Sequence, residues 1–251
     1  MLLPNPWDAG SARVLDALGF QALATTSSGF AATLGRADMS VTRDEALAHA
    51  GAIVAVTSLP VSADLENGFA DDPDGVAQTV TMAVAAGLAG CSIEDATGRD
   101  DDPIYPADLA AERIAAAVEA AGDQLVITAR AENFLHGRAD AAGLADVVAR
   151  LQSFQAAGAH VLYAPGLTDI DHIRTVVAEV DRPVNVLALP AAPTVAELAD
   201  VGVARVSVGG AFAFAALGAL VDAAREFQTL GTYGFTAQTR TGREVAGSAF
   251  A

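Results

Sequence analysis

The stretch that decides the fold runs Pro60-Val61-Ser62-Ala63-Asp64-Leu65-Glu66-Asn67-Gly68. It begins as a short apolar strand, exposes two carboxylates and an amide within four residues, and ends in a glycine turn. The same pattern returns at Gly90-Cys91-Ser92-Ile93-Glu94-Asp95 and at Thr128-Ala129-Arg130-Ala131-Glu132-Asn133. When successive strands all end in acids, amides or arginine, we expect those ends to converge on one site. This convergence predicts an enzyme.

Short apolar runs alternate with helical patterns along almost the whole chain. The expected strands cover residues 1–3, 22–26, 53–56 or 61–64, 90–93, 125–129, 160–163, 183–187 and 205–208. The expected helices cover residues 11–18, 42–51, 74–86, 106–121, 141–157, 169–180, 194–201 and 211–227. Short connections between such pairs require parallel strands with helical crossovers, which close most economically into a (β/α)8 TIM barrel. A doubly wound open sheet is the alternative fold.

The chain has the length of one barrel, since its 251 residues match the roughly 250 that this fold typically takes. No low-complexity linker interrupts the alternation, so residues 1–251 are interpreted as a single domain. The tail at residues 231–251 is expected to be mobile or to contact a neighbouring subunit. Cys91 is the single cysteine, which excludes an internal disulfide, and its place within a strand indicates a core residue.

The composition argues against two classes of partner. The formal net charge is −17 and the isoelectric point is about 4.3, so the surface repels phosphate backbones and anionic lipids. We therefore expect no nucleic acid and no membrane surface as partners. The N-terminus lacks a basic segment followed by an apolar core, and the uncharged run at residues 206–221 has 16 residues, fewer than the roughly 20 that span a bilayer. A cytoplasmic protein is expected.

Carboxylates that follow apolar strands are candidates for a metal site. Asp64 and Glu94 occupy this position, and Glu66 lies in the turn after Asp64. Two or three such oxygens, completed by water, suit a hard cation such as Mg²⁺. The alternative is that these acids only cap the following helices or remain solvated.

Arg130 is the only basic residue at these strand ends. A fixed guanidinium is the natural bidentate partner of a substrate carboxylate. An ion pair with Glu94 or Glu132 that only holds the barrel together is the alternative. Ser27 and Ser28 offer consecutive backbone N–H groups and two hydroxyls, which can form a nest for an anionic oxygen.

Six motifs at the strand ends form a recognisable set. They are Asn5-Pro6-Trp7-Asp8-Ala9-Gly10-Ser11-Ala12-Arg13, Thr26-Ser27-Ser28-Gly29, Leu34-Gly35-Arg36-Ala37-Asp38, Ser62-Ala63-Asp64, Ser92-Ile93-Glu94-Asp95 and Thr128-Ala129-Arg130. Together they resemble the isocitrate lyase/phosphoenolpyruvate mutase superfamily over about residues 3–220. The resemblance implies a (β/α)8 barrel, often with the C-terminal helix swapped between subunits, so a homodimer or homotetramer is expected.

The resemblance also implies chemistry and a cofactor. Members act on a small 2-oxo or 2-hydroxy carboxylic acid, whose bond to carbon or phosphorus is cleaved through an enolate-like state. They use Mg²⁺, for which Mn²⁺ can substitute. By position, Ser27 and Ser28 would give amides to the substrate carboxylate and the enolate oxygen. Asp64 and Glu94 would belong to the metal shell, with Glu94 also acting in catalysis.

Further roles follow from the same comparison. Arg130 would hold the substrate carboxylate, and Asp38 would lie near the reacting atoms. Trp7 belongs to the first motif and is a candidate for substrate contact. Asn133 and His136 follow the strand that ends at Arg130, and they are candidates because the loop after that strand can reach a substrate.

Departures from the family pattern shape the expected function. Ser62 stands where members usually carry an aspartate, and Glu66 stands where they usually carry a glycine, so Glu66 is a substitute metal ligand. The loop at residues 96–103 has no cysteine, histidine or lysine, although the true lyases carry a cysteine acid there. Authentic isocitrate or methylisocitrate lyase activity is therefore not expected.

The expected function is cleavage or decarboxylation of a small 2-oxo or 2-hydroxy acid with Mg²⁺. Without the lyase cysteine, the proton donor to the carbanion would be water, Tyr105 or His136. One alternative is the C–P chemistry of phosphonopyruvate hydrolases and phosphoenolpyruvate phosphonomutases, although this chain has no lysine for their loop. The other alternative is a non-catalytic protein that binds 2-oxo acids.

Overall fold

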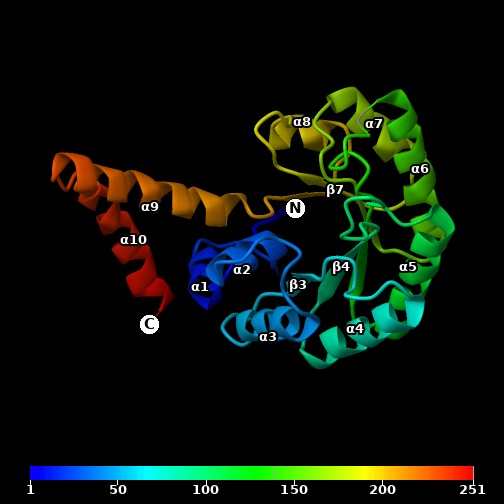
Figure 1. The fold of residues 1–251 in the computed structure, drawn as a ribbon, viewed down its shortest axis with the longest axis horizontal. Coiled ribbons are helices and arrows are strands. Elements are labelled where there is room, and N and C mark those ends of the chain that lie inside the picture. The colour runs from blue at the N-terminus through cyan, green and yellow to red at the C-terminus, as the bar shows by residue number, and fades with distance from the viewer. Residues whose placement is uncertain (139, 251) are drawn as a thin grey trace.

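The computed structural model describes residues 1–138 and 140–250. Its strands are β1 (Leu2–Leu3), β2 (Leu23–Ala24), β3 (Val61–Asp64), β4 (Gly90–Glu94), β5 (Val126–Arg130), β6 (Val161–Tyr163), β7 (Val184–Leu187) and β8 (Arg205–Ser207). They form one parallel sheet in the order β1-β8-β7-β6-β5-β4-β3-β2. Figure 1 shows helices on the outside of this sheet. The N–H of Ala24 donates to the carbonyl of Pro4 at 3.0 Å and brings the sheet edges together. The barrel is thus nearly closed, which confirms the predicted (β/α)8 fold and not the open sheet.

Helices follow the strands around the outside of the barrel. They are α1 (Ala9–Ala17), α2 (Ser27–Thr33), α3 (Arg43–Val54), α4 (Pro73–Ala85), α5 (Ala107–Ala121), α6 (Ala141–Ala156), α7 (Ile170–Glu179), α8 (Val195–Asp200), α9 (Ala211–Leu230) and α10 (Thr236–Ala249). Local sequence signals begin several of them. Thr42 caps α3 and exchanges hydrogen bonds with Glu45 in a capping box.

The structure decides between the two alternatives for the third strand. It is residues 61–64, because residues 53 and 54 complete the last turn of α3, where Ile53 is fully buried. Residues 27–29 form the start of a helix, α2, that the sequence analysis did not predict. The Thr26 side chain accepts a hydrogen bond from the N–H of Gly29 and so begins that helix.

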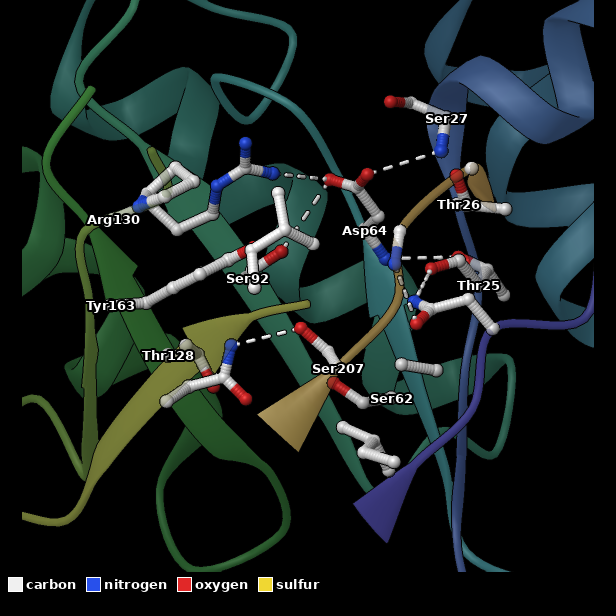
Figure 2. Close-up of a pocket in the computed structure, with 18 of the residues that line it drawn as sticks. Thr25, Thr26, Ser27, Ser62, Asp64, Ser92, Thr128, Arg130, Tyr163 and Ser207 are labelled. Atoms are coloured by element: carbon white, nitrogen blue, oxygen red, sulfur yellow. Dashed lines mark hydrogen bonds and ion pairs between the residues drawn. The ribbon is translucent and has the colours of Figure 1, made fainter. Parts of the chain in front are cut away.

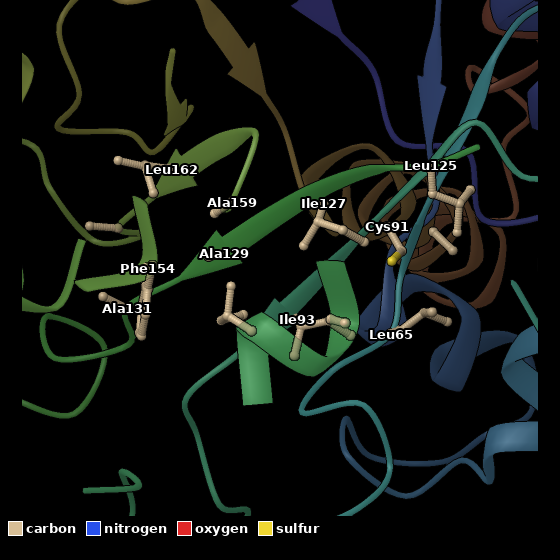
Figure 3. Packing of buried hydrophobic residues seen from close by; sticks show 14 of the residues in the cluster. Leu65, Cys91, Ile93, Leu125, Ile127, Ala129, Ala131, Phe154, Ala159 and Leu162 are labelled. Atoms are coloured by element: carbon tan, nitrogen blue, oxygen red, sulfur yellow. The ribbon is translucent and has the colours of Figure 1, made fainter. Parts of the chain in front are cut away.

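The apolar core lies between the barrel wall and the surrounding helices. Alternate residues of a strand point to opposite faces, so Cys91 and Ile93 of β4 and Ile127 and Ala129 of β5 all point outward. All four are 0% exposed, and Figure 3 shows their side chains within the apolar cluster. The prediction that Cys91 is a core residue is confirmed.

The last two helices leave the barrel. Helix α9 extends away from it, and α10 turns back so that it packs against α1 (Figure 1). Most of the 231–251 tail is therefore helical and contacts its own chain; residue 251 lies outside the described residues. Among the helices described, none combines the length and apolarity that crossing a membrane requires.

Candidate active site

The carboxyl ends of the strands surround a cavity of about 210 Å³. Barrel interiors are usually filled by bulky branched side chains, but many of the residues that line this cavity are small or polar. They include Asn185 and, labelled in Figure 2, Ser62, Ser92, Thr128 and Ser207. A second cavity of about 650 Å³ lies next to it and shares Ser27, Asp38, Arg130 and Leu135. The first cavity is the interior of the candidate site, and the second is its outer part.

Arg130 occupies the centre of this site. Its Nη1 lies 3.1 Å from Oδ1 of Asp64 and 3.0 Å from Oε2 of Glu94. Its Nη2 lies 2.8 Å from Oε1 of Glu132, which also accepts from Nε at 2.9 Å. The Arg130 side chain is only 14% exposed, so one buried guanidinium serves three carboxylates. The predicted alternative of ion pairs to Glu94 and Glu132 is present, and binding of a substrate carboxylate stays a prediction.

The Asp64 carboxylate is held from several strands. The N–H of Ser27 donates to its Oδ2 at 3.1 Å, and the Ser92 hydroxyl donates to its Oδ1 at 3.5 Å (Figure 2). The backbone N–H of Asp64 itself donates to Oγ1 of Thr25 at 2.9 Å. These bonds fix the orientation of Asp64 toward Arg130.

Burial shifts the protonation of the acids around Arg130. It raises the pKa of Glu94 well above the ordinary range, although the charge of Arg130 opposes this effect. It also raises the pKa of Asp38, with a hydrogen bond from the Ser27 side chain in opposition. Burial, together with the charges of Asp64 and Asp38, raises the pKa of Glu66 to about 8. The site therefore holds carboxyl groups that keep their protons at higher pH than ordinary acids.

Glu66 does not line the main cavity. It is 4% exposed, and its Oε1 has no hydrogen-bond partner among the described residues. Its backbone has φ of 49°, a left-handed conformation that usually belongs to glycine. It lines a small separate cavity with Thr26, His49 and Asp64. Glu66 is thus near Asp64 but is not directed into the main cavity, and its role as a metal ligand stays a prediction.

The donor set around Arg130 can be compared with the needs of Mg²⁺. In residues 1–138 and 140–250, no three His, Cys, Asp or Glu side chains form a metal-binding group. Oxygens of Asp64 and Glu94 nevertheless converge on one atom, Nη1 of Arg130. Mg²⁺ usually takes one or two carboxylates and completes its shell with water and substrate oxygens. This pair therefore fits a Mg²⁺ ion that is held jointly with a substrate.

The structure brings most of the predicted residues together. The main cavity is lined by Ser27, Ser28, Asp38, Asp64 and Arg130, and the outer cavity adds Glu94 and His136.

Besides Glu66, two candidates line neither of these cavities. The backbone carbonyl of Trp7 contacts the His49 ring at 3.0 Å. Asn133 is 0% exposed, and its Nδ2 donates to Asp146 of α6 at 2.5 Å. Both contacts lie within the scaffold, so the structure gives these two residues supporting positions.

Two buried arginines that sequence reasoning missed support the site from the helices. Arg113 of α5 donates to the backbone carbonyls of Asn67, Ala70 and Glu94. Arg150 of α6 donates from Nη1 to Asp95 at 3.0 Å. No sequence pattern distinguishes these two arginines, because an arginine in a predicted helix is expected to be exposed to solvent unless its neighbours in the fold are known.

Comparisons with known proteins identify the family of this chain. The profile of the family described as phosphoenolpyruvate phosphomutase matches residues 1–228. The chain belongs to the isocitrate lyase/phosphoenolpyruvate mutase superfamily. Its predicted resemblance to this superfamily is thereby confirmed.

Individual members of the superfamily show how far the similarity extends. A solved structure from Burkholderia cenocepacia J2315, named only at the level of lyase/mutase, is 52% identical and covers 100% of this chain and 91% of its own, with a TM-score of 0.95. Oxaloacetate decarboxylase from Chromohalobacter salexigens is 31% identical over 231 residues, 88% of this chain and 78% of that protein. 2-Methylisocitrate lyase from Escherichia coli K12 is 32% identical over 186 residues, 70% of this chain and 61% of that protein. Superfamily membership supports an enzyme of the lyase, decarboxylase or phosphonomutase type.

Proposed function

We propose that this protein is a Mg²⁺-dependent enzyme that cleaves a carbon–carbon bond in a small 2-oxo or 2-hydroxy carboxylic acid, with decarboxylation as the favoured reaction. The observation that carries the proposal is the convergence of Asp64 and Glu94 on Arg130 at the carboxyl ends of the strands. In barrels of this kind, that end is where the chemistry takes place.

The residues of the site suit a reaction that passes through an enolate. Breaking the bond between C3 and C4 of a 2-oxo acid leaves an electron pair on C3, the carbon next to the oxo group, and this pair is delocalised onto the oxo oxygen. Arg130 supplies fixed positive charge in the cavity, and the backbone amide of Ser28 is a donor there, so both can stabilise this oxygen. The amide of Ser27 already donates to Asp64. Asp64 and Glu94 would hold Mg²⁺, which supplies further positive charge to the same oxygen when bound.

The loop at residues 96–103 favours decarboxylation over the lyase reaction. It has no cysteine, histidine or lysine. Carbon dioxide leaves without taking up a proton, whereas cleavage of a 2-hydroxy acid requires a base to remove the hydroxyl proton. The absence of the lyase cysteine therefore counts against the lyase reaction, whereas a decarboxylase needs only a proton donor to the enolate.

The enolate still needs a proton, and the structure distinguishes the two predicted donors. The Tyr105 hydroxyl donates to Asp71, and Tyr105 lines neither cavity. Burial and the bond to Asp71 raise the pKa of Tyr105 to about 12. His136 lines the outer cavity. His136 or water, rather than Tyr105, is therefore the proposed proton source.

The test is turnover of oxaloacetate with Mg²⁺, followed by NMR as pyruvate forms. The wild type should exceed the spontaneous rate, and Asp64→Asn should return it to that rate. Asp222→Asn, on the exposed part of α9, removes the same charge away from the site and should keep wild-type turnover. Phosphate release from phosphonopyruvate would instead favour C–P chemistry, and binding of oxaloacetate with no product would favour a non-catalytic binding protein.

We further propose that the protein is a homodimer or homotetramer in which α9 packs on a second copy. Exposed apolar residues lie along this helix: Phe212, Phe214, Leu217, Leu220, Val221, Phe227 and Leu230. An apolar face of this length on a helix that leaves its own barrel is typical of a subunit interface. The helix swap that the superfamily resemblance implies would cover it.

A further inference from the structure

Arg205 lies inside the barrel lumen, deeper than Arg130. It begins β8, and its Nε donates to Oδ1 of Asn185 at 2.8 Å. Its Nη2 donates to Oγ1 of Thr128 at 3.0 Å. Thr128 comes two residues before Arg130 on β5, so the Arg205 guanidinium lies at the level below the Arg130 cluster. Sequence reasoning missed this residue, although its alternation with Ser207 on one strand could have indicated that it faces the lumen.

The charge of Arg205 has no counter-ion in the part of the chain that the structure describes. No carboxylate lies within ion-pair distance, and no hydrogen bond to its Nη1 is found there. Its two hydrogen-bond partners are neutral and hold the guanidinium in place without balancing its charge. Burial lowers the pKa of Arg205 to about 10, which leaves it protonated at neutral pH. Arg205 is half-buried, and a charge that has lost part of its hydration is stabilised when an anion joins it.

The surroundings of Arg205 leave room for such an anion. Arg205 lines the main cavity together with Ser62 and Ser207. Arg205 and Ser62 also border a mostly apolar cavity of about 320 Å³ at the opposite end of the barrel. The apolar walls on one side reduce the contact of Arg205 with water, so an ion pair formed here is less screened than one on the open surface.

The charges around Arg130 favour an anion that lies deeper in the lumen, nearer to Arg205. Arg130 already faces Asp64, Glu94 and Glu132. Even when Glu94 keeps its proton, the other two carboxylates outnumber this one guanidinium. Without a bound cation, the carboxylates around Arg130 repel an incoming carboxylate. Arg205, whose partners are neutral, attracts it.

We propose that Arg205 binds a carboxylate group of a small acid within the barrel lumen, separately from the Mg²⁺-dependent contacts around Arg130. The unused N–H groups of the guanidinium match the geometry of a carboxylate, and the neighbouring hydroxyls can donate to it. The inference rests on the proposed function for the source of that carboxylate, which is one end of the substrate. It then selects dicarboxylic acids as the substrate class.

The first experiment measures binding without chemistry. Malonate is titrated into the full-length protein by calorimetry in EDTA, so that Mg²⁺-dependent contacts do not contribute. The wild type should bind, Arg205→Gln should weaken binding by roughly tenfold or more, and Arg205→Lys should retain part of it. Arg174→Gln removes an equal charge from an exposed position and should bind as the wild type does. Thermal unfolding checks that each variant is folded. Thr128→Val removes the hydroxyl that Nη2 of Arg205 donates to and keeps the charge of Arg205, so it tests whether the orientation of the guanidinium affects binding.

The outcomes separate this inference from the proposed function. Equal malonate affinity in the wild type and a folded Arg205→Gln would overturn it, as would the absence of metal-free binding to the wild type. Displacement of malonate by chloride at equal concentration would show an unselective anion site and overturn the assignment to a carboxylate. Loss of metal-free binding in Arg205→Gln would support the inference even if no substrate is turned over. If oxaloacetate is turned over by the wild type, a raised KM in Arg205→Gln with a smaller change in kcat would identify the bound carboxylate as part of the substrate.

Discussion

Oδ1 of Asp64 and Nη1 of Arg130 lie 3.1 Å apart, although the two residues are 66 positions apart in the sequence. Asp64 ends β3 and Arg130 ends β5, and β4 between them contributes Glu94 at its own end. The parallel register pairs Glu94 with Arg130 directly. The active-site cluster is therefore a consequence of strand order, and its charges depend on one another.

Removal of Arg130 should destabilise the whole barrel. Arg130→Ala leaves Asp64, Glu94 and Glu132 without their shared cation in a buried site. Breaking a buried ion pair by deleting one partner costs about 3–5 kcal/mol, and urea denaturation should show a loss of that order in the free energy of unfolding. Arg174→Ala deletes an exposed arginine and should cost less than about 1 kcal/mol. Equal small losses in the two variants would contradict the central role of Arg130.

The protonation of Glu66 should appear in the pH dependence of stability. Its pKa rises from 4.5 to about 8 in the folded protein, so the unfolded chain loses this proton at lower pH than the folded chain does. The contribution of Glu66 to stability is therefore present below pH 4.5 and is lost as the pH rises toward 8. The glutamine side chain of the Glu66→Gln variant cannot ionise. As the pH rises from 4.5 toward 8, the melting temperature of this variant should therefore rise above that of the wild type. A gain of roughly 2–4 °C at the upper end corresponds to about 1 kcal/mol in a chain of this size. A constant difference between the two proteins at every pH would contradict the shift.

The single carboxylate contributed by β3 should limit the affinity for Mg²⁺. Ser62 and Asp64 lie two residues apart on β3 and point to the same face. Ser62→Asp would add a second carboxylate beside Asp64, and calorimetric titration with Mg²⁺ should show roughly tenfold tighter binding. Ser153→Asp places the same charge on the exposed surface of α6, away from the site, and serves as the matched control. No gain from Ser62→Asp would exclude Asp64 from the metal shell.

The apolar face of α9 should control assembly. Leu220 is 62% exposed, and Leu220→Asp would place a charge in the proposed interface. Light scattering after gel filtration should then show a shift from the oligomer toward a monomer. Thr229 lies nine residues later on α9, about half a turn around the helix, so Thr229→Asp adds the same charge to the opposite face. Dissociation by both variants, or by neither, would contradict an interface on the Leu220 face.

The barrel could be predicted because its signals are local. The alternation of apolar strands with capped helices, such as the helix that Thr42 and Glu45 begin, is read directly from neighbouring residues. The acids and the arginine at the ends of β3, β4 and β5 could be placed on one edge because all parallel strands point the same way. The structure bears out that placement for Asp64, Glu94 and Arg130.

Other features depended on packing between distant segments. Glu66 looks equivalent to Asp64 in the sequence, but its left-handed backbone turns it into a separate cavity. Tyr105 follows the loop at residues 96–103, but its hydroxyl donates a hydrogen bond to Asp71 and does not line the site. No local pattern distinguishes these cases, because the direction of a side chain after a strand end depends on the loop that receives it.

The sequence by itself determined the barrel, the family and the edge of the sheet at which acids, amides and Arg130 meet, since each follows from periodicity or from short motifs. Only the tertiary structure decided how the charges are distributed. It gave Arg130 three carboxylates, placed Arg113 and Arg150 beneath the loops of the site, and left Arg205 in the lumen with neutral partners. The physical reason is that the energy of a charge depends on its neighbours and its burial, and both are set by contacts between residues far apart in the chain.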